Sequence, residues 1–90
     1  MSVQIDIPPL LRHVTDGETA ARVKGSTVGE CLNDFIRQYP KTKKWLFDKD
    51  GKLLRYVEVY VNKVTTYPEE LATPVNDGDE ISIVYVIAGG

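Results

Sequence analysis

The pattern of hydrophobic and polar positions predicts one amphipathic helix near the middle of the chain. Within residues 28–39, apolar side chains recur at helical spacing and form one stripe suited to a core: Val28, Cys31, Leu32, Phe35, Ile36 and Tyr39. Just before them, Thr27 and Glu30 have the spacing of a capping box, in which a hydroxyl and a carboxylate bind free N–H groups of the first turn. Pro40 ends the helix. The opposite face is polar and is predicted to be solvated: Asn33, Asp34, Arg37 and Gln38.

Alternating residues predict a hairpin at the N-terminal end of the chain. In residues 3–7 every second side chain is apolar, which is typical of a strand with one buried face. Pro8-Pro9 ends this strand, and Asp16-Gly17 gives a turn signal before a weaker extended stretch, residues 18–24. We expect the two stretches to pair.

The C-terminal part of the chain predicts two further strands. Residues 57–61 alternate and end in a turn at Asn62, whereas residues 67–75 contain two prolines and are expected to form a loop with a short helical turn. Residues 80–87 are apolar on both faces near their end, which predicts a central strand. The order hairpin, helix, strands favours an α+β fold. We expect a ubiquitin-like β-grasp, a mixed sheet with one main helix packed across it and with its first and last strands parallel.

A basic cluster, Lys41, Lys43 and Lys44, lies just before residues 45–47, Trp-Leu-Phe. We interpret the lysines as a solvated run. An acidic partner for them is the alternative that stays open. The residues that follow predict one turn of helix, with Trp45 and Phe47 as a small satellite of the core.

Composition is that of one globular domain and excludes several functions. The chain has 90 residues, of which 42% are hydrophobic and 27% charged, both near the averages for globular proteins. A net charge of −2 offers no basic surface for nucleic acid. There is no stretch of about 18 apolar residues and no secretory leader, so we expect a cytoplasmic protein without a membrane segment.

The single cysteine and the single histidine predict neither a metal site nor a catalytic group. Cys31 lies in the apolar stripe of the helix and is expected to be a buried, inert thiol, since free cysteine is among the most buried residue types. His13 has no partner apparent in the sequence and is expected at the surface. We therefore predict no metal ligands and no catalytic residues.

The chain ends in Ala88, Gly89 and Gly90 directly after the last predicted strand. Glycine has no Cβ and lets a backbone approach a ligand closely. Three extended residues reach about 10 Å. We expect a slim, flexible tail, residues 88–90, that can place the Gly90 carboxylate in the active site of a partner enzyme. An ordinary chain end is the alternative.

These features resemble the ubiquitin-like sulfur carriers of the MoaD and ThiS family, and most closely the CysO type that serves cysteine biosynthesis. The resemblance covers essentially all 90 residues, as one β-grasp domain. It is carried by residues 7–12, 27–32, 39–40, 51–62 and 76–80, and by the C-terminal residues 88–90. The block at 51–62 and the block from 76 to the end are the most specific.

The resemblance implies a carrier and not an enzyme. An E1-like adenylyltransferase of the MoeB or ThiF type would adenylate the Gly90 carboxylate with ATP and magnesium, and sulfur would then displace AMP to leave a thiocarboxylate. For the CysO type it implies a sulfur-accepting enzyme, a pyridoxal-phosphate-dependent cysteine synthase. The chain itself would bind no cofactor. The alternatives are the small subunit of molybdopterin synthase, a thiamine-type sulfur carrier, a ubiquitin-like protein modifier and a structural interaction domain.

The sheet face opposite the helix is the predicted docking surface, around Tyr60, Val84 and Val86. A small sheet with one helix leaves its second face partly open, and an exposed apolar patch is typical of a docking site. The assignment depends on register, because a shift of one residue moves every side chain of a strand to the other face.

Overall fold

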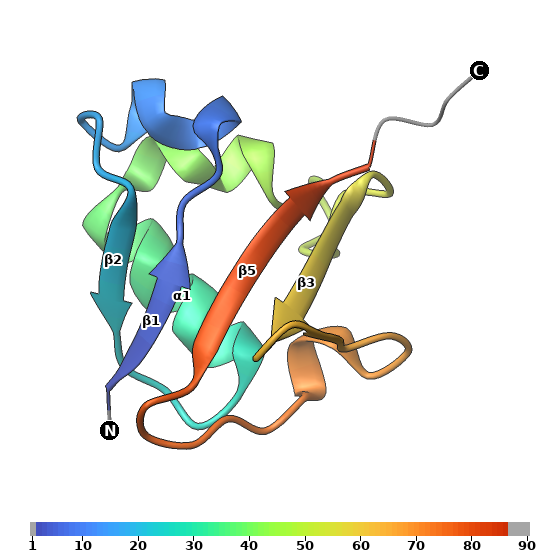
Figure 1. The fold of residues 1–90 in the computed structure, drawn as a ribbon. Helices are drawn as coiled ribbons and strands as arrows, with labels where there is room; N and C mark the ends of the chain where they lie inside the picture. Colours follow the sequence, from blue (N-terminus) through green and yellow to red (C-terminus); the bar gives the residue numbers. More distant parts are fainter. Residues whose placement is uncertain (1, 87–90) are drawn as a thin grey trace.

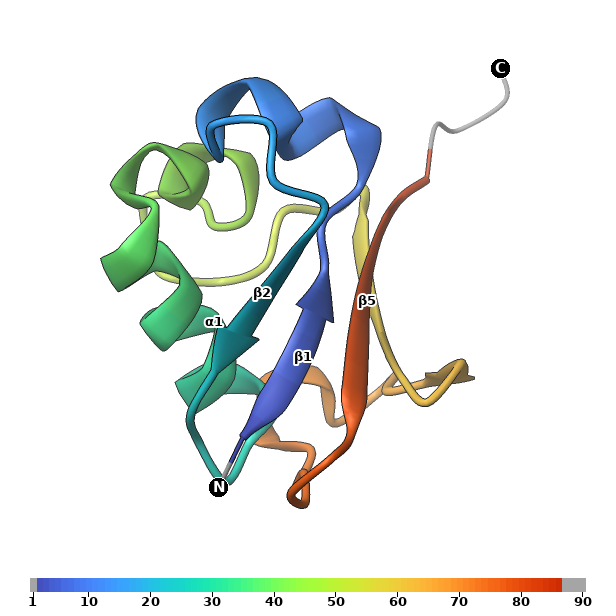
Figure 2. The ribbon, with the colours of Figure 1, turned by 60° about the vertical axis from the view of Figure 1, so that its left-hand side comes forward.

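The computed structural model describes residues 2–86, which form one mixed five-stranded sheet with a single α-helix across one face (Figure 1). The strand order is β2-β1-β5-β3-β4. The first strand, β1 (Val3–Asp6), lies parallel to β5 (Glu80–Tyr85), and the other neighbours are antiparallel. Figure 2 shows α1 on one side of the sheet, with the other side of β1 and β5 not covered by a helix. The predicted β-grasp fold and the central position of the last strand are confirmed.

The N-terminal hairpin pairs β1 with β2 (Ala20–Val23). Val3 and Ile5 are buried because alternation directs every second side chain of β1 toward the helix. This confirms the predicted hairpin, although the second strand is shorter than the extended stretch. No helix or strand was predicted in the connection between β1 and β2. The structure has a 3-10 helix there, η1 (Pro9–Val14), which buries Leu11.

The helix α1 spans Val28–Gln38 and packs its apolar stripe on the sheet. Thr27 Oγ1 accepts a hydrogen bond from the Glu30 N–H at 3.1 Å, and the Glu30 carboxylate accepts one from the Ser26 N–H at 2.8 Å. The two bonds satisfy donors at the start of the helix. Four members of the predicted stripe are fully buried: Val28, Cys31, Leu32 and Phe35. The predicted helix and the Thr27 half of its cap are confirmed, whereas the Glu30 carboxylate binds Ser26, the residue before the N-cap, and not an N–H of the first turn.

Asp34, one residue of the predicted solvated face, links the helix to the backbone that follows β2. Its Oδ2 accepts from the Lys24 N–H at 2.9 Å, and its Oδ1 accepts from the Arg37 guanidinium. The hydrogen bonds from Arg37 and Lys24 lower the pKa of Asp34. The assignment of Asp34 to solvent was wrong, since only 14% of its side chain is exposed. The helix lies along β2, which is an edge strand. At the end of the helix, the side-chain amide of Gln38 donates a hydrogen bond to the Arg22 carbonyl of β2 at 2.9 Å.

The segment after α1 forms a second 3-10 helix, η2 (Pro40–Trp45). Thr42 is fully buried, and its hydroxyl donates to a backbone carbonyl at 2.6 Å. Leu46 and Phe47 follow and are buried in the main core. The predicted helical turn therefore lies earlier than residues 45–47, and Phe47 belongs to the core itself. Trp45 is partly buried and packs against that core.

In the C-terminal half, β3 (Val57–Val61) lies between β5 and a short edge strand, β4 (Val64–Thr65). Only a turn was predicted after Asn62, so β4 was missed. A strand of two residues carries no alternation that a sequence pattern could reveal. The helical turn predicted within residues 67–75 is present as η3 (Glu70–Ala72).

Candidate functional site

Alternation along β5 divides its side chains between the two faces of the sheet. Ile81 and Ile83 are 0% and 4% exposed beneath the helix layer, whereas Val84 is 39% exposed on the other side. Val86 follows the strand and is 41% exposed, and its N–H donates to the Tyr56 carbonyl at 2.7 Å. The two apolar faces that predicted a central strand therefore have different surroundings, a core on one side and solvent on the other.

Tyr60 lies on the same uncovered face as the two valines. It pairs with Ser82, and Glu58 pairs with Val84, and cross-strand partners share a face. The Tyr60 hydroxyl donates to Glu58 Oε1 at 2.9 Å, and this bond raises the pKa of Tyr60. The structure thus places Tyr60, Val84 and Val86 on one face. Their docking role stays a prediction.

We call this surface the open face. Its members, by strand pairing and alternation, are Gln4, Asp6, Ala20, Arg22, Glu58, Tyr60, Thr65, Glu80, Ser82, Val84 and Val86.

The start of β5 gives the open face an acidic half. Gln4 pairs with Glu80 and Asp6 with Ser82, so the two carboxyl groups lie on neighbouring strands. Gln4 Nε2 donates to Asp6 Oδ1 at 2.9 Å. A hydrogen bond with the Asp6 carboxyl and the negative charge of that group raise the pKa of Glu80. Sequence reasoning missed this half, although the alternation of β1 already separates Gln4 and Asp6 from its buried residues.

Tyr85 fastens the end of β5 to the helix layer. Its hydroxyl donates to the Trp45 carbonyl at 2.6 Å. Burial raises the pKa of Tyr85, so the hydroxyl remains a protonated donor at ordinary pH. The last strand is thereby fixed immediately before the predicted tail. The tail itself, Ala88, Gly89 and Gly90, lies outside the described residues 2–86.

Cys31 and His13 occupy the positions that the sequence predicted for them. Cys31 is 0% exposed, and burial raises the pKa of its thiol, so it stays protonated. His13 is exposed on η1, and its ring meets Trp45 edge-on with the ring centroids 5.3 Å apart. Within residues 2–86, no three His, Cys, Asp or Glu side chains gather in a way that could hold a metal ion. None of the helices described there is both long enough and apolar enough to cross a bilayer.

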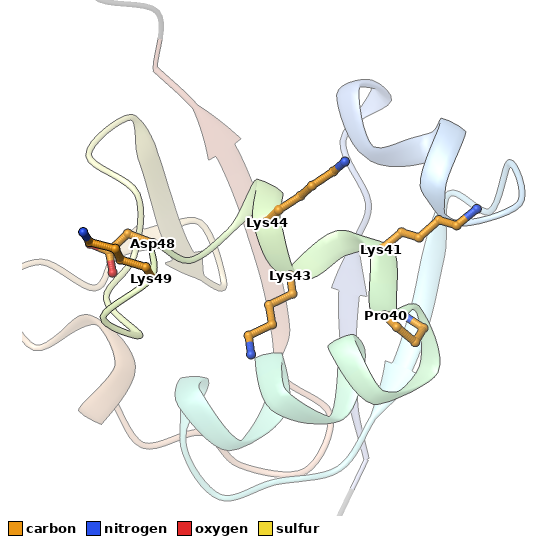
Figure 3. Close-up of a pocket in the computed structure, with 6 residues that line it drawn as sticks. All are labelled: Pro40, Lys41, Lys43, Lys44, Asp48 and Lys49. Carbon is orange, nitrogen blue, oxygen red and sulfur yellow. The ribbon is translucent and has the colours of Figure 1, made fainter.

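A hollow of about 380 Å³ lies along η2 (Figure 3). It is lined by Pro40, Lys41, Lys43, Lys44, Asp48 and Lys49. Figure 3 shows Lys41 and Lys44 extending to one side of η2 and Lys43 pointing to the other. The amino groups therefore diverge and do not converge on one small anion.

Comparison with known proteins identifies the family. The sequence profile of the ThiS family matches residues 10–90. The chain is 36% identical to the sulfur carrier protein CysO of Mycobacterium tuberculosis over 93 aligned residues, which cover all of both chains.

Solved structures with the same fold include a chain of the Amycolatopsis orientalis BexX/CysO complex, with a TM-score of 0.88 and 36% identity over 98% of this chain and 99% of that one. Another is the small archaeal modifier protein 1 of Methanosarcina acetivorans, with a TM-score of 0.86 and 25% identity over 99% of this chain and 96% of that one. The profile match, the identity and the fold agree. The chain belongs to the ThiS family of ubiquitin-like sulfur carriers, which are not themselves enzymes.

Proposed function

We propose that this protein is a sulfur carrier of the CysO type that supplies sulfur for cysteine biosynthesis. The observation that carries the proposal is the 36% identity to Mycobacterium tuberculosis CysO over the whole chain. The fold similarity supports it, and the family match extends to Gly90 and so includes the predicted tail.

The proposed reaction sequence begins at the Gly90 carboxylate. An E1-like adenylyltransferase of the MoeB or ThiF type, using ATP and magnesium, joins AMP to this carboxylate and releases pyrophosphate. A carboxylate is a poor electrophile, whereas the acyl adenylate carries a good leaving group. Sulfide then attacks the acyl carbon, AMP leaves, and Gly90 ends in a thiocarboxylate.

The thiocarboxylate delivers its sulfur to a second enzyme. For the CysO type we propose a cysteine synthase in which pyridoxal phosphate supplies the electrophilic chemistry. The carrier contributes the sulfur on Gly90, and Ala88 and Gly89 provide a backbone slim enough to enter an active site. ATP, magnesium and pyridoxal phosphate are bound by the partner enzymes.

The open face is the proposed docking surface for the activating enzyme. Val84 and Val86 expose apolar area beside the end of β5, and Tyr60 lies on the same face. Glu58 pairs with Val84 at one edge of this area, and Asp6 and Glu80 lie on the same face toward the start of β5. An exposed apolar patch with a polar rim is typical of a protein docking site. A partner bound there would hold the end of β5 close to its own active site.

The function is tested by the intact mass of the protein after incubation with ATP, magnesium, sulfide and a MoeB- or ThiF-type enzyme. We expect the mass increase that accompanies replacement of one oxygen by sulfur, located in the C-terminal peptide. A variant lacking Gly90 is the control and should gain no sulfur there. An unchanged mass of the wild-type protein under these conditions would contradict the proposal.

The docking surface is tested by Val86→Asp. A charge buried against an apolar partner surface should lower kcat/KM for adenylation by roughly tenfold or more. Val64→Asp is the matched control, because Val64 is 66% exposed on β4, outside the open face. Circular dichroism would verify that both variants fold. If adenylation of the two variants is equally fast, the open face is not where the activating enzyme docks.

The similarity to the small archaeal modifier protein 1 of Methanosarcina acetivorans favours a second candidate, a ubiquitin-like modifier. In that case the activated Gly90 carbonyl would react with the amino group of a target lysine and form an isopeptide bond. Higher-mass conjugates in cells that disappear when Gly90 is deleted would support this function. Sulfur transfer without conjugates would support the carrier function alone.

A further inference from the structure

We infer that Tyr56 is a positioning residue for the proposed adenylation of Gly90. It holds the end of β5 in one place, immediately before the predicted tail. The inference rests on the proposed function, because it concerns the same carboxylate. Tyr56 acts through the last residues of β5 and takes no part in the chemistry itself.

The end of β5 has fewer strand partners than its start. The pairing of β1 with β5 runs from Glu80 to Ser82, whereas the pairing of β3 with β5 continues to Tyr85 (Figure 1). Beyond Tyr85, the Val86 N–H donates to the Tyr56 carbonyl at 2.7 Å. Strand ends with few partners open more readily than the middle of a sheet. The position of Val86 therefore depends on how firmly Tyr56 is held.

The backbone of Tyr56 is tied to the core through a turn. The Val57 N–H donates to the Leu54 carbonyl at 3.0 Å, and the Leu54 N–H donates to the Leu46 carbonyl at 2.9 Å. Leu46 is fully buried. The carbonyl that binds Val86 therefore belongs to a turn whose position is set by the core.

The ring of Tyr56 provides a second link to the end of β5. It packs against the ring of Tyr85 with the ring centroids 6.2 Å apart and an angle of 37° between the ring planes. This separation is within the range of stabilising aromatic pairs. Tyr85 is fixed in turn by the hydrogen bond from its hydroxyl to the Trp45 carbonyl. Tyr56 thus holds two consecutive residues, Val86 with its carbonyl and Tyr85 with its ring.

The position of the strand end matters because Gly90 is only four residues beyond Val86 in the sequence. If Tyr85 and Val86 came loose from the sheet, the segment between the paired strand and the carboxylate would grow from residues 87–90 to residues 85–90. The effective concentration of a tethered group falls as the tether lengthens, here by roughly twofold. A less exact orientation of the carboxylate lowers the rate further.

Tyr56 is suited to this role because it contributes little to the core. Its side chain is 49% exposed, and it lies outside the cluster of buried residues. Removal of the ring should therefore loosen the end of β5 and leave the rest of the fold intact.

The test is Tyr56→Ala, with two measurements. In hydrogen exchange followed by NMR, the Val86 amide should exchange faster by roughly twofold to tenfold, the factor expected for loss of one aromatic pair. The Ser82 amide, in the part of β5 that pairs with both β1 and β3, reports opening of the whole sheet and should change less.

The second measurement is pyrophosphate release by a MoeB- or ThiF-type enzyme with ATP and magnesium. For Tyr56→Ala we expect kcat to fall by roughly twofold or more, while KM for the carrier is unchanged because the open face is intact. Tyr56→Phe keeps the ring and should restore both kcat and the slow exchange of the Val86 amide.

Tyr67→Ala is the matched control, because it makes the same substitution at a side chain that is 75% exposed and lies between β4 and η3. Equal kcat values for Tyr56→Ala and Tyr67→Ala overturn the positioning role. A raised KM with an unchanged kcat also overturns it, since Tyr56 would then be a docking residue. Equal acceleration of exchange at Ser82 and Val86 would show that the ring stabilises the whole domain and not the strand end.

Failure of the proposed function gives a different result. In that case the wild-type protein itself is not adenylated, whereas the exchange of the Val86 amide still shows whether Tyr56 holds the end of β5. The two failures are therefore distinguishable.

Discussion

The two faces of β5 differ in what surrounds them, although they belong to the same six residues. On the covered face, Ile81 and Ile83 are buried beneath the helix layer. On the open face, Ser82 is half-buried and Val84 is exposed. One strand thus contributes to the core with one set of side chains and offers a surface with the other. Stability and the proposed docking thus depend on alternate residues of one strand, so we expect that each can be changed without the other.

The largest expected difference between the faces is between Ile81→Ala and Val84→Ala. Ile81 is 0% exposed, and removing its side chain leaves a cavity, so we expect the free energy of unfolding to fall by about 3 kcal/mol. Val84 is 39% exposed, and its truncation should change the free energy of unfolding by about 0.5 kcal/mol or less. Urea denaturation of the two variants measures both values. If the free energy of unfolding falls by a similar amount in both variants, the open face also contributes to the stability of the fold.

A smaller difference is expected between two tyrosines, one on each face. Tyr85→Phe removes the hydrogen bond to the partly buried Trp45 carbonyl, which should lower the free energy of unfolding by about 1 kcal/mol. Tyr60→Phe removes a bond to Glu58 at the surface, where water replaces it, and should have almost no effect. Thermal and urea unfolding of both variants test this. If Tyr60→Phe is the more harmful change, the roles of the two faces are reversed.

The helix and the longer strands were predicted because they have enough residues to show a period, whereas the short turn η3 was expected in a loop marked by two prolines. The helix α1 and the strands β1, β3 and β5 were recognised because apolar residues recur at 3.6 or 2 positions. The elements η1 and β4 were missed. The two residues of β4 cannot show alternation, and the fold of η1 depends on burying Leu11 under distant parts of the chain. Asp34 was misplaced for the same reason, since its partner Lys24 lies outside the helix.

The candidate site was predicted in part. Alternation alone placed Tyr60, Val84 and Val86 on one face, which the register of β3 and β5 bears out. The acidic half of the open face could not be predicted in the same way, because it forms only where β1 pairs with β5. These two strands lie at opposite ends of the chain, and neither sequence by itself determines their register. The predicted tail, residues 88–90, lies beyond the last residue that the structure describes, Val86.

The acidic half makes the open face sensitive to pH. A hydrogen bond with Asp6 and its charge raise the pKa of Glu80 above its ordinary value of 4.5. A carboxyl that holds its proton more tightly in the folded state stabilises the fold while it is protonated. This contribution is complete below about pH 4.5 and is lost as the pH rises through the raised pKa. Glu30 and Asp79 act in the opposite sense, because hydrogen bonds from Ser26 and Asn76 lower the pKa of each.

The smallest expected effect is that of Glu80 alone, measured separately from Glu30 and Asp79. Glu80→Gln removes the titration, so the variant should be more stable than the wild type at about pH 7 and lose this advantage at about pH 4, where Glu80 is protonated. Urea midpoints of both proteins at the two pH values measure the difference, which added salt should reduce because the site is at the surface. Glu69→Gln removes a carboxyl group at an exposed position outside the open face and is the control. An advantage of equal size at both pH values would mean that the Asp6 carboxyl does not act on Glu80, and the open face would then have no pH-dependent half.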